Sequence, residues 1–386
     1  MKLPPGNHEK AGRVSTFACH KDGRPSSRIV TGLGWTHIRE SATTPITHHK
    51  AEAVRHTVGI IANPAASKDI RRLVAQGRVV PDWEKVNIVR RALIGLQSTE
   101  VDKVVAMPDS GNLCRRAADD SSISIPLEML PMSPLYTEGD TTRAAAMMAE
   151  MGVGCLITLG GDGTNRAVAV GTNQVPLVAI STGTNNIFPV MVEGTLAGIA
   201  AGLIASERLS AADVAIVSKT LQIHVNGEPR DLALVDVAVS RERYVATRAI
   251  WDLDTVYEVF LTRAEPAGIG LSSVGGRLHP LSLADVGGLR YRLAGRGATD
   301  ANTTIIAPVA PGMVEPASIA EWGLLHEGVP VALERRYCTL ALDGERSLVL
   351  SPDDAVEIVL ARDGPPVVQV QRALLRAAQL GLFGYA

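Results

Sequence analysis

Short apolar segments alternate with amphipathic ones through the first half of the chain. The apolar segments are typical of buried strands, and the segments with a 3.6-residue period are typical of helices. Strands are predicted at Val58–Ala62, Lys103–Met107, Ser124–Leu130, Leu156–Leu159 and Leu177–Ile180. Helices are predicted from Ser67 or Asp69 through Ala75 and at Trp83–Leu96, Gly111–Ala118, Asp140–Met151 and Thr195–Glu207. This alternation predicts an α/β domain over residues 56–212, with a doubly wound parallel sheet that binds ligands at its carboxyl end.

The pattern changes near Asp213, where short strands with glycine and proline between them replace the helices. Lys219–Val225 and Leu232–Val239 flank Asn226-Gly227, which is a strong hairpin signal. Residues 213–370 are therefore predicted to form an all-β domain. Gln371–Leu382 has a helical pattern, and the C-terminal segment 371–386 is expected to pack back on the first domain.

Residues 1–55 have no sustained hydrophobic period, and six of the nine histidines of the chain lie within residues 1–56. Their spacing matches no metal-ligand pattern, so a disordered tail is the favoured interpretation. An over-extended translation start is a further hypothesis for this segment.

Composition narrows the class of protein. The chain has 386 residues and a formal net charge of -2, which argues against a nucleic-acid partner. The longest candidate for a membrane span, Leu196–Ala205, is too short to cross a bilayer, and the N-terminus lacks the apolar core of a signal peptide. The four cysteines, Cys19, Cys114, Cys155 and Cys338, show neither a disulfide framework nor a zinc pattern. A cytoplasmic location without a membrane partner is expected, and no metal-binding residue is predicted.

The most informative segment is Cys155–Thr164, CLITLGGDGT, in which an apolar strand runs into a glycine turn. Gly160, Gly161 and Gly163 are predicted to adopt positive φ and to let the backbone approach a ligand. A helix expected from Asn165 onward would offer its free N–H groups to a phosphate. The carboxylate of Asp162 would repel a phosphate unless it accepts a proton or holds a metal ion.

A second polar turn, Ser181–Pro189 with the sequence STGTNNIFP, follows the fifth strand. Its hydroxyls and amides can bind sugar hydroxyls or phosphate oxygens, although a capped strand-to-helix loop is an alternative interpretation. Because neighbouring parallel strands end at the same edge of a sheet, the two turns are expected to form one crevice. Asn63-Pro64, with Lys68 nearby, closes the first strand, and Asp236 and Pro308–Gly312 are later candidates.

These segments resemble the NAD kinase, diacylglycerol kinase and phosphofructokinase superfamily. LGGDGT at Leu159–Thr164 looks like its signature. The similarity continues at Ala233–Val239, at Gly270–Pro280, at Ile306–Gly312 and in LDGE at Leu342–Glu345. Narrower matches at Ile61–Leu73, Gly160–Ala169 and Ser181–Pro189 resemble the acetoin catabolism protein X family, a branch similar to NAD kinases.

The resemblance implies an NAD-kinase-like fold, phosphorylation of a nucleotide hydroxyl with ATP, Mg²⁺ and NAD, and a homo-oligomer. It implies that Asp162 acts as general base. The residues expected at the nucleotide phosphates are Asn63, Lys68, Gly160, Gly161, Gly163, Thr164, Asn165 and Arg166. Those expected at the acceptor are Thr182, Gly183, Thr184, Asn185, Asn186 and Asp236. For Lys68 and Arg166 an ordinary surface position is the competing interpretation.

The chain also departs from the NAD kinase pattern. Val235-Asp236 replaces an Asn-Glu pair, AGIGLS at Ala267–Ser272 replaces a hydroxyl-rich stretch that contains a tyrosine, and Gly312 replaces a histidine. These changes concern the acceptor more than the phosphates. Two alternatives therefore stay open: a lipid kinase of the diacylglycerol kinase type, and a dinucleotide-binding protein without catalysis.

Overall fold

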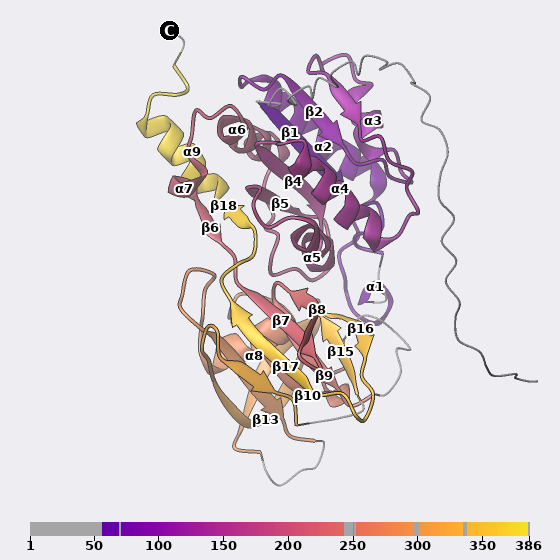
Figure 1. The fold of residues 1–386 in the computed structure, drawn as a ribbon, viewed down its shortest axis with the longest axis vertical. Coiled ribbons are helices and arrows are strands. Elements are labelled where there is room, and N and C mark those ends of the chain that lie inside the picture. The colour runs from indigo at the N-terminus through magenta and orange to yellow at the C-terminus, as the bar shows by residue number, and fades with distance from the viewer. Residues whose placement is uncertain are drawn as a thin grey trace, which may run out of the picture. The chain divides into compact units, whose positions relative to one another are not determined.

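The structure is a computed structural model that describes residues 56–68, 71–242, 250, 252–295, 301–334 and 338–384 (Figure 1). The predicted tail, residues 1–55, lies outside the described residues, and so does Cys19.

A seven-stranded sheet organises the first half of the chain (Figure 1). Five strands run parallel in the order β3 (Leu127–Met129), β2 (Lys103–Ala106), β1 (Thr57–Ala62), β4 (Cys155–Gly160) and β5 (Leu177–Ser181). The sheet continues with β18 (Pro366–Val368), parallel to β5, and with β6 (Ala215–Val217), antiparallel to β18. The chain therefore returns to its first sheet near its C-terminal end, and β6 extends that sheet beyond residue 212.

Helices cover both faces of this sheet. On one face lie α2 (Asp82–Gln97), α3 (Leu113–Ala118), α6 (Gly194–Ala205) and α9 (Val370–Gln379), whose apolar side chains share a core with Ile60 and Leu159. On the other face lie α4 (Glu138–Glu150) and α5 (Asp162–Gly171), which pack with Ile61 and Leu156. The predicted doubly wound parallel sheet is confirmed, and α9 packs on this half, where the sequence pattern placed the C-terminal segment.

Two predicted elements are shorter than expected. Of the predicted strand Ser124–Leu130, only β3 forms a strand. Pro126, directly before it, has no N–H to donate to the neighbouring strand. The helix expected to end at Ala75 is the single turn α1 (Arg71–Val74). After α6 a short helix α7 (Ala211–Val214) leads into β6, so the predicted domain boundary after residue 212 falls inside α7.

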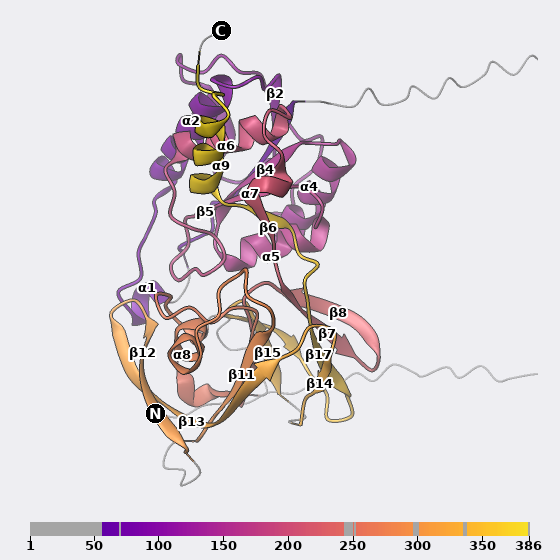
Figure 2. The same cartoon turned by 90° about the vertical axis from the view of Figure 1, so that its left-hand side faces the viewer.

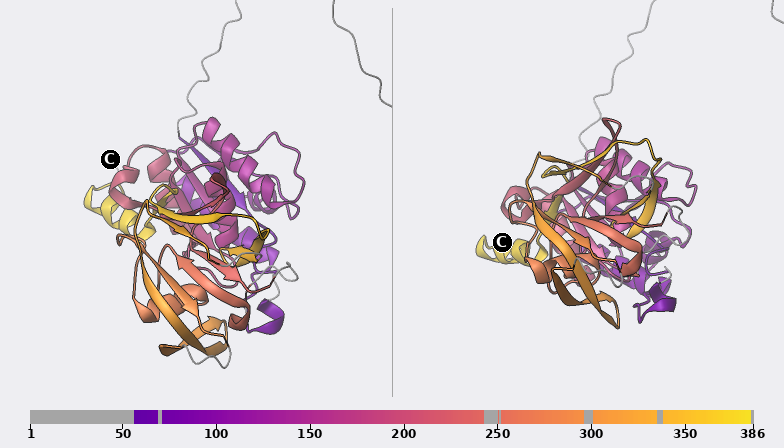
Figure 3. Two further views of the ribbon diagram at one scale, coloured as in Figure 1. Left: turned by 60° about the horizontal axis from the view of Figure 1, so that its bottom comes forward. Right: turned by 90° about the horizontal axis from the view of Figure 1, so that it is seen from below.

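The second half consists of two antiparallel sheets that pack face to face. One has four strands in the order β14 (Pro330–Ala332), β17 (Val356–Ala361), β7 (Thr220–Val225) and β8 (Glu228–Ala233). The other has the order β12 (Thr303–Ala310), β13 (Met313–Leu325), β11 (Gly288–Leu293), β10 (Val256–Leu261), β9 (Asp236–Ser240), β15 (Thr339–Leu342) and β16 (Glu345–Val349). Ile223, Phe260 and Leu340 belong to the core between them. Figure 2 shows the two sheets of this half, with helix α8 (Leu271–Leu278) next to β11 and β12. Figure 3 shows the same strands from below.

The predicted hairpin forms around Asn226-Gly227, whose φ values are 56° and 84°. Its second strand was predicted as one segment, Leu232–Val239, and is in fact two strands in different sheets. The chain leaves β8 at Ala233 and starts β9 at Asp236, because the N–H groups of Leu234 and Val235 donate to the carboxylate of Asp343 instead of to a strand.

Within the described residues, no helix combines the length and apolar character needed to cross a bilayer. The side chains of Cys114, Cys155 and Cys338 are buried.

Candidate functional site

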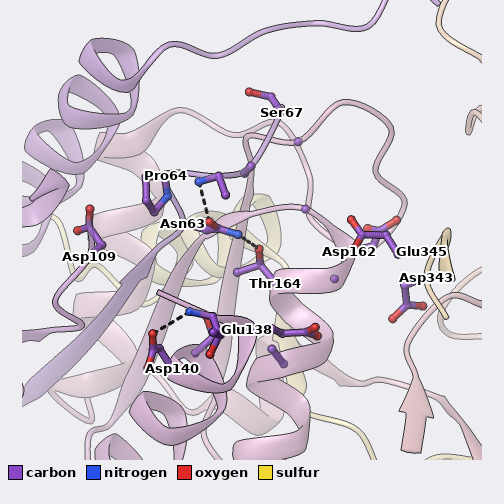
Figure 4. A pocket seen from close by; sticks show the side chains of 18 of the residues that line it. Asn63, Pro64, Ser67, Asp109, Glu138, Asp140, Asp162, Thr164, Asp343 and Glu345 are labelled. Atoms are coloured by element: carbon purple, nitrogen blue, oxygen red, sulfur yellow. Dashed lines mark hydrogen bonds between the residues drawn. The ribbon is translucent and has the colours of Figure 1, made fainter. Parts of the chain in front are cut away.

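A cavity of about 300 Å³ opens at the carboxyl ends of β1, β2, β4 and β5 (Figure 4). The loops after these four strands line it, together with the loop before α4. The β half contributes two residues, Asp343 and Glu345. The cavity thus lies where a doubly wound sheet is expected to bind its ligand.

The glycine turn at this cavity differs from the prediction in its backbone conformation. Helix α5 begins at Asp162, three residues earlier than expected, and the N-cap Gly161 has φ −106°. Gly160, Gly161 and Gly163 do not adopt positive φ, so that expectation was wrong. The lack of a Cβ serves close packing instead. A Cβ at Gly160 would lie 2.4 Å from the Thr164 side chain, and one at Gly161 would lie 2.9 Å from Oδ1 of Asn186.

Asp162 joins the two polar turns. Its carboxylate is buried and accepts hydrogen bonds from the backbone N–H of Ile187 at 3.1 Å and of Phe188 at 2.8 Å. The acid is thereby held against the Ser181–Pro189 turn while it lines the cavity. Burial, and secondly the charge of Asp343, raise the pKa of Asp162 to about 7. A carboxyl group with this pKa can accept a proton at neutral pH.

Asp343 is a site residue to which the sequence analysis gave no role, although LDGE was noted as a point of resemblance. It lies in the turn between β15 and β16 with φ 51°, followed by Gly344 with φ 77°. Its carboxylate accepts the N–H groups of Leu234, Val235 and Asp236. Burial raises the pKa of Asp343 to about 6. In Figure 4 Asp343 and Glu345 lie on the same side of the cavity as Asp162.

The loop after β1 forms the wall next to the N-terminus of α5. Asn63 donates from Nδ2 to Oγ1 of Thr164 at 2.8 Å and accepts the N–H of Ala65 through Oδ1 (Figure 4). Lys85, which was not predicted from the sequence, holds this loop by hydrogen bonds to its backbone. Its ammonium is fully buried and donates to the carbonyls of Pro64 and Ala66 at 2.8 Å. Burial lowers the pKa of Lys85 to about 8. Its position on the helical face of α2 gave no signal, since lysine rarely lies at a core position.

Four of the residues expected at the phosphates do not line the cavity. Lys68 is exposed and pairs with Asp82 at 3.2 Å. Arg166 is buried, and its guanidinium is engaged by Glu138 and, at 2.9 Å, by Asp231 of β8. Asn165 is buried and bonds to Thr158 and to the Gly161 carbonyl. The structure therefore gives Arg166 and Asn165 internal partners and leaves Lys68 at the surface. Gly160 also lies outside the lining.

Four of the residues expected at the acceptor line the cavity, namely Gly183, Thr184, Asn185 and Asn186. Asn186 donates to Oγ of Ser181 at 2.7 Å. The side-chain oxygens of Thr184 and Asn185 are buried without a hydrogen-bond partner, so both are available to a ligand. Thr182 is buried and lies outside the lining.

Asp236 lies in a second, smaller cavity of about 30 Å³ that adjoins the first one. Asp162, Asn185 and Asp343 line both cavities. The remaining wall is mainly aliphatic and is formed by Ile187, Ile250, Leu253, Ile269, Leu271 and Val309. The Asp236 carboxylate accepts the N–H of Gly344. The predicted acceptor residues thus divide between the two cavities.

Arg263 is a buried cation in this region whose charge acts on Asp162 and Asp343. Its guanidinium lies over the Phe188 ring at 5.3 Å, bonds to the Ile187 carbonyl and pairs with Glu265 at 3.6 Å. Its charge favours the ionised forms of Asp162 and Asp343.

The charged side chains that line the first cavity, the main cavity, are negative. Six carboxylates line it, those of Asp109, Glu138, Asp140, Asp162, Asp343 and Glu345. Among the described residues that line it there is no lysine, arginine or histidine. A phosphate ligand would therefore depend on the α5 N-terminus and on a cation that binds with it. The described part of the chain holds no ready cluster of three or more metal-ligating side chains. This fits Mg²⁺ held mainly by phosphates, with one or two carboxylates as its protein ligands.

Two family models match successive parts of the chain. Residues 58–208 match the family model of the ATP-NAD kinase N-terminal domain, and residues 219–363 match that of the acetoin catabolism protein X C-terminal domain. The chain is 40% identical over 315 residues to acetoin catabolism protein X of Cupriavidus necator, which covers 78% of this chain and 87% of that protein. The crystal structure of yeast NADH kinase complexed with NADH has 15% identity and a TM-score of 0.48, covering 87% of this chain and 90% of that chain. A likeness of that size carries no information on what this chain binds. The family matches support a kinase-like enzyme whose first half is of the NAD kinase type.

Proposed function

This chain belongs to the acetoin catabolism protein X family, and we propose that it transfers a phosphoryl group from ATP to a hydroxyl group, with the conversion of NAD to NADP as the reaction to test first. The observation that carries the proposal is the position of Asp162. It combines a carboxylate of pKa about 7, a place in the cavity wall and a hydrogen-bonded connection to the acceptor turn.

The phosphates of the donor would lie over the N-terminus of α5. The backbone N–H groups of Gly161, Asp162, Gly163 and Thr164 have no partner within the helix, and the helix dipole favours an anion there. Mg²⁺ bound with the phosphates would neutralise their charge, and Asp162, Asp343 and Glu345 are the nearest candidates among the carboxylates to meet it. None of the described lining residues is basic, so the bound cation would supply most of that neutralisation.

The acceptor would approach from the side of Asn185 and the second cavity. Asp162 accepts the proton of its hydroxyl group. The hydroxyl oxygen forms a bond to the terminal phosphorus, and the bond from that phosphorus to the bridging oxygen of ADP breaks. The free oxygens of Thr184 and Asn185 would orient a ribose, and Asp236 would contact a second polar group. The name of the C. necator relative leads us to include a role in acetoin catabolism in this proposal.

The test is an assay with ATP, Mg²⁺ and NAD, applied to the native chain and to Asp162→Asn. Loss of a general base costs on the order of 10²–10⁴ in rate, so the variant should be almost inactive while it stays folded. Asp353→Asn, at an exposed loop position, is the matched control and should keep full activity. Turnover of Asp162→Asn within a few-fold of the native rate would contradict the role of Asp162.

The same assay separates the alternatives. Consumption of ATP with diacylglycerol and not with NAD would indicate a lipid kinase. Tight NAD binding without turnover would indicate a dinucleotide-binding protein, which the altered acceptor segments also favour.

A further inference from the structure

Tyr136 is an exposed aromatic residue at the rim of the main cavity. Aromatic residues make up only 4% of the chain. Tyr136 lines the cavity and is 68% exposed, so an aromatic side chain is accessible at the rim. An exposed ring is a common feature by itself, but this one has an unusual backbone.

The backbone of Tyr136 has φ 58°, in the left-handed region that tyrosine seldom adopts. The conformation is held by the carboxylate of Asp140, which accepts the N–H of Leu135 at 2.9 Å and of Thr137 at 3.0 Å. Thr137 and Asp140 also form the capping box at the start of α4. The backbone of the loop is thus held by hydrogen bonds on both sides of Tyr136.

The order of the strands in the sheet indicates which loops lie at each end of the cavity. The lining loops follow β3, β2, β1, β4 and β5 in that spatial order, and neighbouring strands lie about 4.8 Å apart. Figure 4 shows Asp162, Asp343 and Glu345 on one side, Asp109 and Asp140 on the other, and Asn63 with Thr164 between them. The transfer end is therefore the β5 end, and the remote end is at β3 and β2.

Tyr136 belongs to the remote end. Thr141, in the first turns of α4, contacts the sulfur of Met107, the residue that follows β2. Met107 and Pro108 line the cavity beside this loop and offer an apolar surface. A triphosphate whose last phosphate lies at Asp162 extends along the Asn63–Ser67 loop and brings its nucleoside to this end.

We propose that Tyr136 stacks on the base of the phosphoryl donor and that Met107 and Pro108 form the other surface of this base subsite. The inference rests on the proposed function and deepens it. The ligand class is a nucleoside triphosphate, and the ring makes the enzyme prefer such a donor to inorganic polyphosphate. Stacking recognises any planar base, because every base has a π face.

The test compares the native chain with Tyr136→Asn and Tyr136→Phe. Asparagine tolerates the left-handed backbone, so Tyr136→Asn removes the ring and keeps the loop. KM for ATP should rise on the order of tenfold in Tyr136→Asn, with kcat little changed, and should stay near the native value in Tyr136→Phe. Leu135→Ala is the control, because Leu135 is 71% exposed next to Tyr136 and does not line the cavity.

A binding measurement makes the result independent of turnover. Calorimetry with Mg²⁺ and the non-hydrolysable adenosine 5′-(β,γ-imido)triphosphate should show the same tenfold loss in Tyr136→Asn, and Mg²⁺ with inorganic tripolyphosphate should bind both proteins equally. If the native chain uses ATP and the ring changes neither KM nor affinity, the inference falls and the proposed function stands. If the native chain binds the analogue but shows no turnover with any acceptor, the proposed function falls. The affinities of the native chain and Tyr136→Asn for the analogue then decide whether Tyr136 contacts the base. Failure of the native chain to bind the analogue overturns both.

Discussion

At the scale of single residues, the pKa of Asp162 is set by opposed effects. Burial and the charge of Asp343 disfavour its ionised form, whereas the N–H groups of Phe188 and Ile187 favour it. Burial is the larger effect, and the resulting pKa of about 7 lies where a general base works best, because the ionised form is present at neutral pH and still binds a proton well.

Arg263 should set the pH at which the site becomes active. Since the proposed base must be ionised, kcat/KM is expected to rise with pH through about 7. Arg263→Met removes a charge that favours ionised Asp162, so the midpoint of this rise should move to higher pH. A pH–rate profile checks this, with Arg290→Met, which breaks ion pairs on the β half, as control. An unchanged midpoint in Arg263→Met would show that its charge does not act on the base.

The same acid should make stability depend on pH. The folded-state pKa of Asp162 lies above its ordinary value of 3.8, so the folded chain binds this proton more tightly than the unfolded chain does. The stabilisation is complete below that ordinary value and is lost as pH rises through about 7. Asp162→Asn stays neutral, so its free energy of unfolding relative to the native chain should be higher at pH 8 than at pH 5, by up to about 3 kcal/mol. Urea unfolding at both pH values measures this difference, and an equal difference at both would refute it.

At the scale of elements, the hydrophobic pattern was sufficient for the parallel sheet and its helices, because buried strands and amphipathic helices have local signatures. Properties that depend on distant partners were not accessible in this way. The backbone at Gly160 and Gly161 is set by the packing of Thr164 and Asn186, and the start of α5 by its cap. Asp343 takes its place through N–H groups more than a hundred residues earlier in the chain.

The contact between α2 and α6 depends on glycine. A Cβ at Gly198 would lie 2.2 Å from the carbonyl oxygen of Ala92, so Gly198→Ala forces the two helices apart. We expect a loss of about 1–3 kcal/mol in the free energy of unfolding. Gly139→Ala is the control, since its Cβ would have only Thr137 nearby, at 3.6 Å. Denaturant unfolding of both variants checks the prediction, and equal stability would argue against close packing at Gly198.

At the scale of the whole molecule, the two halves are connected by side-chain hydrogen bonds and by a return of the backbone to the first sheet. Arg166 of α5 bonds to Asp231 of β8, and Arg263 of the β half bonds to the Ile187 carbonyl. Near the end of the chain, β18 lies between β5 and β6 in the first sheet. The first half is therefore not complete without residues from the end of the sequence.

Removal of residues 365–386 should abolish folding of the first half. The deletion takes out β18, leaves an edge of β5 without its partner and exposes the side chains that α9 covers. The expected result is insoluble or aggregated protein. Removal of residues 384–386 alone leaves β18 and α9 intact and should give folded protein. Circular dichroism and size-exclusion chromatography distinguish the outcomes, and a folded monomer from the longer deletion would refute the prediction.

The place of β18 also has a consequence during synthesis. The ribosome makes β1 through β6 early, yet β18, which lies between β5 and β6, emerges only after the β half has been translated. At bacterial elongation rates this delay is on the order of ten seconds, during which one edge of a nascent sheet stays open to other chains. Chaperones that shield exposed strand edges should therefore matter more for the yield of this protein than for one whose first domain is continuous in sequence.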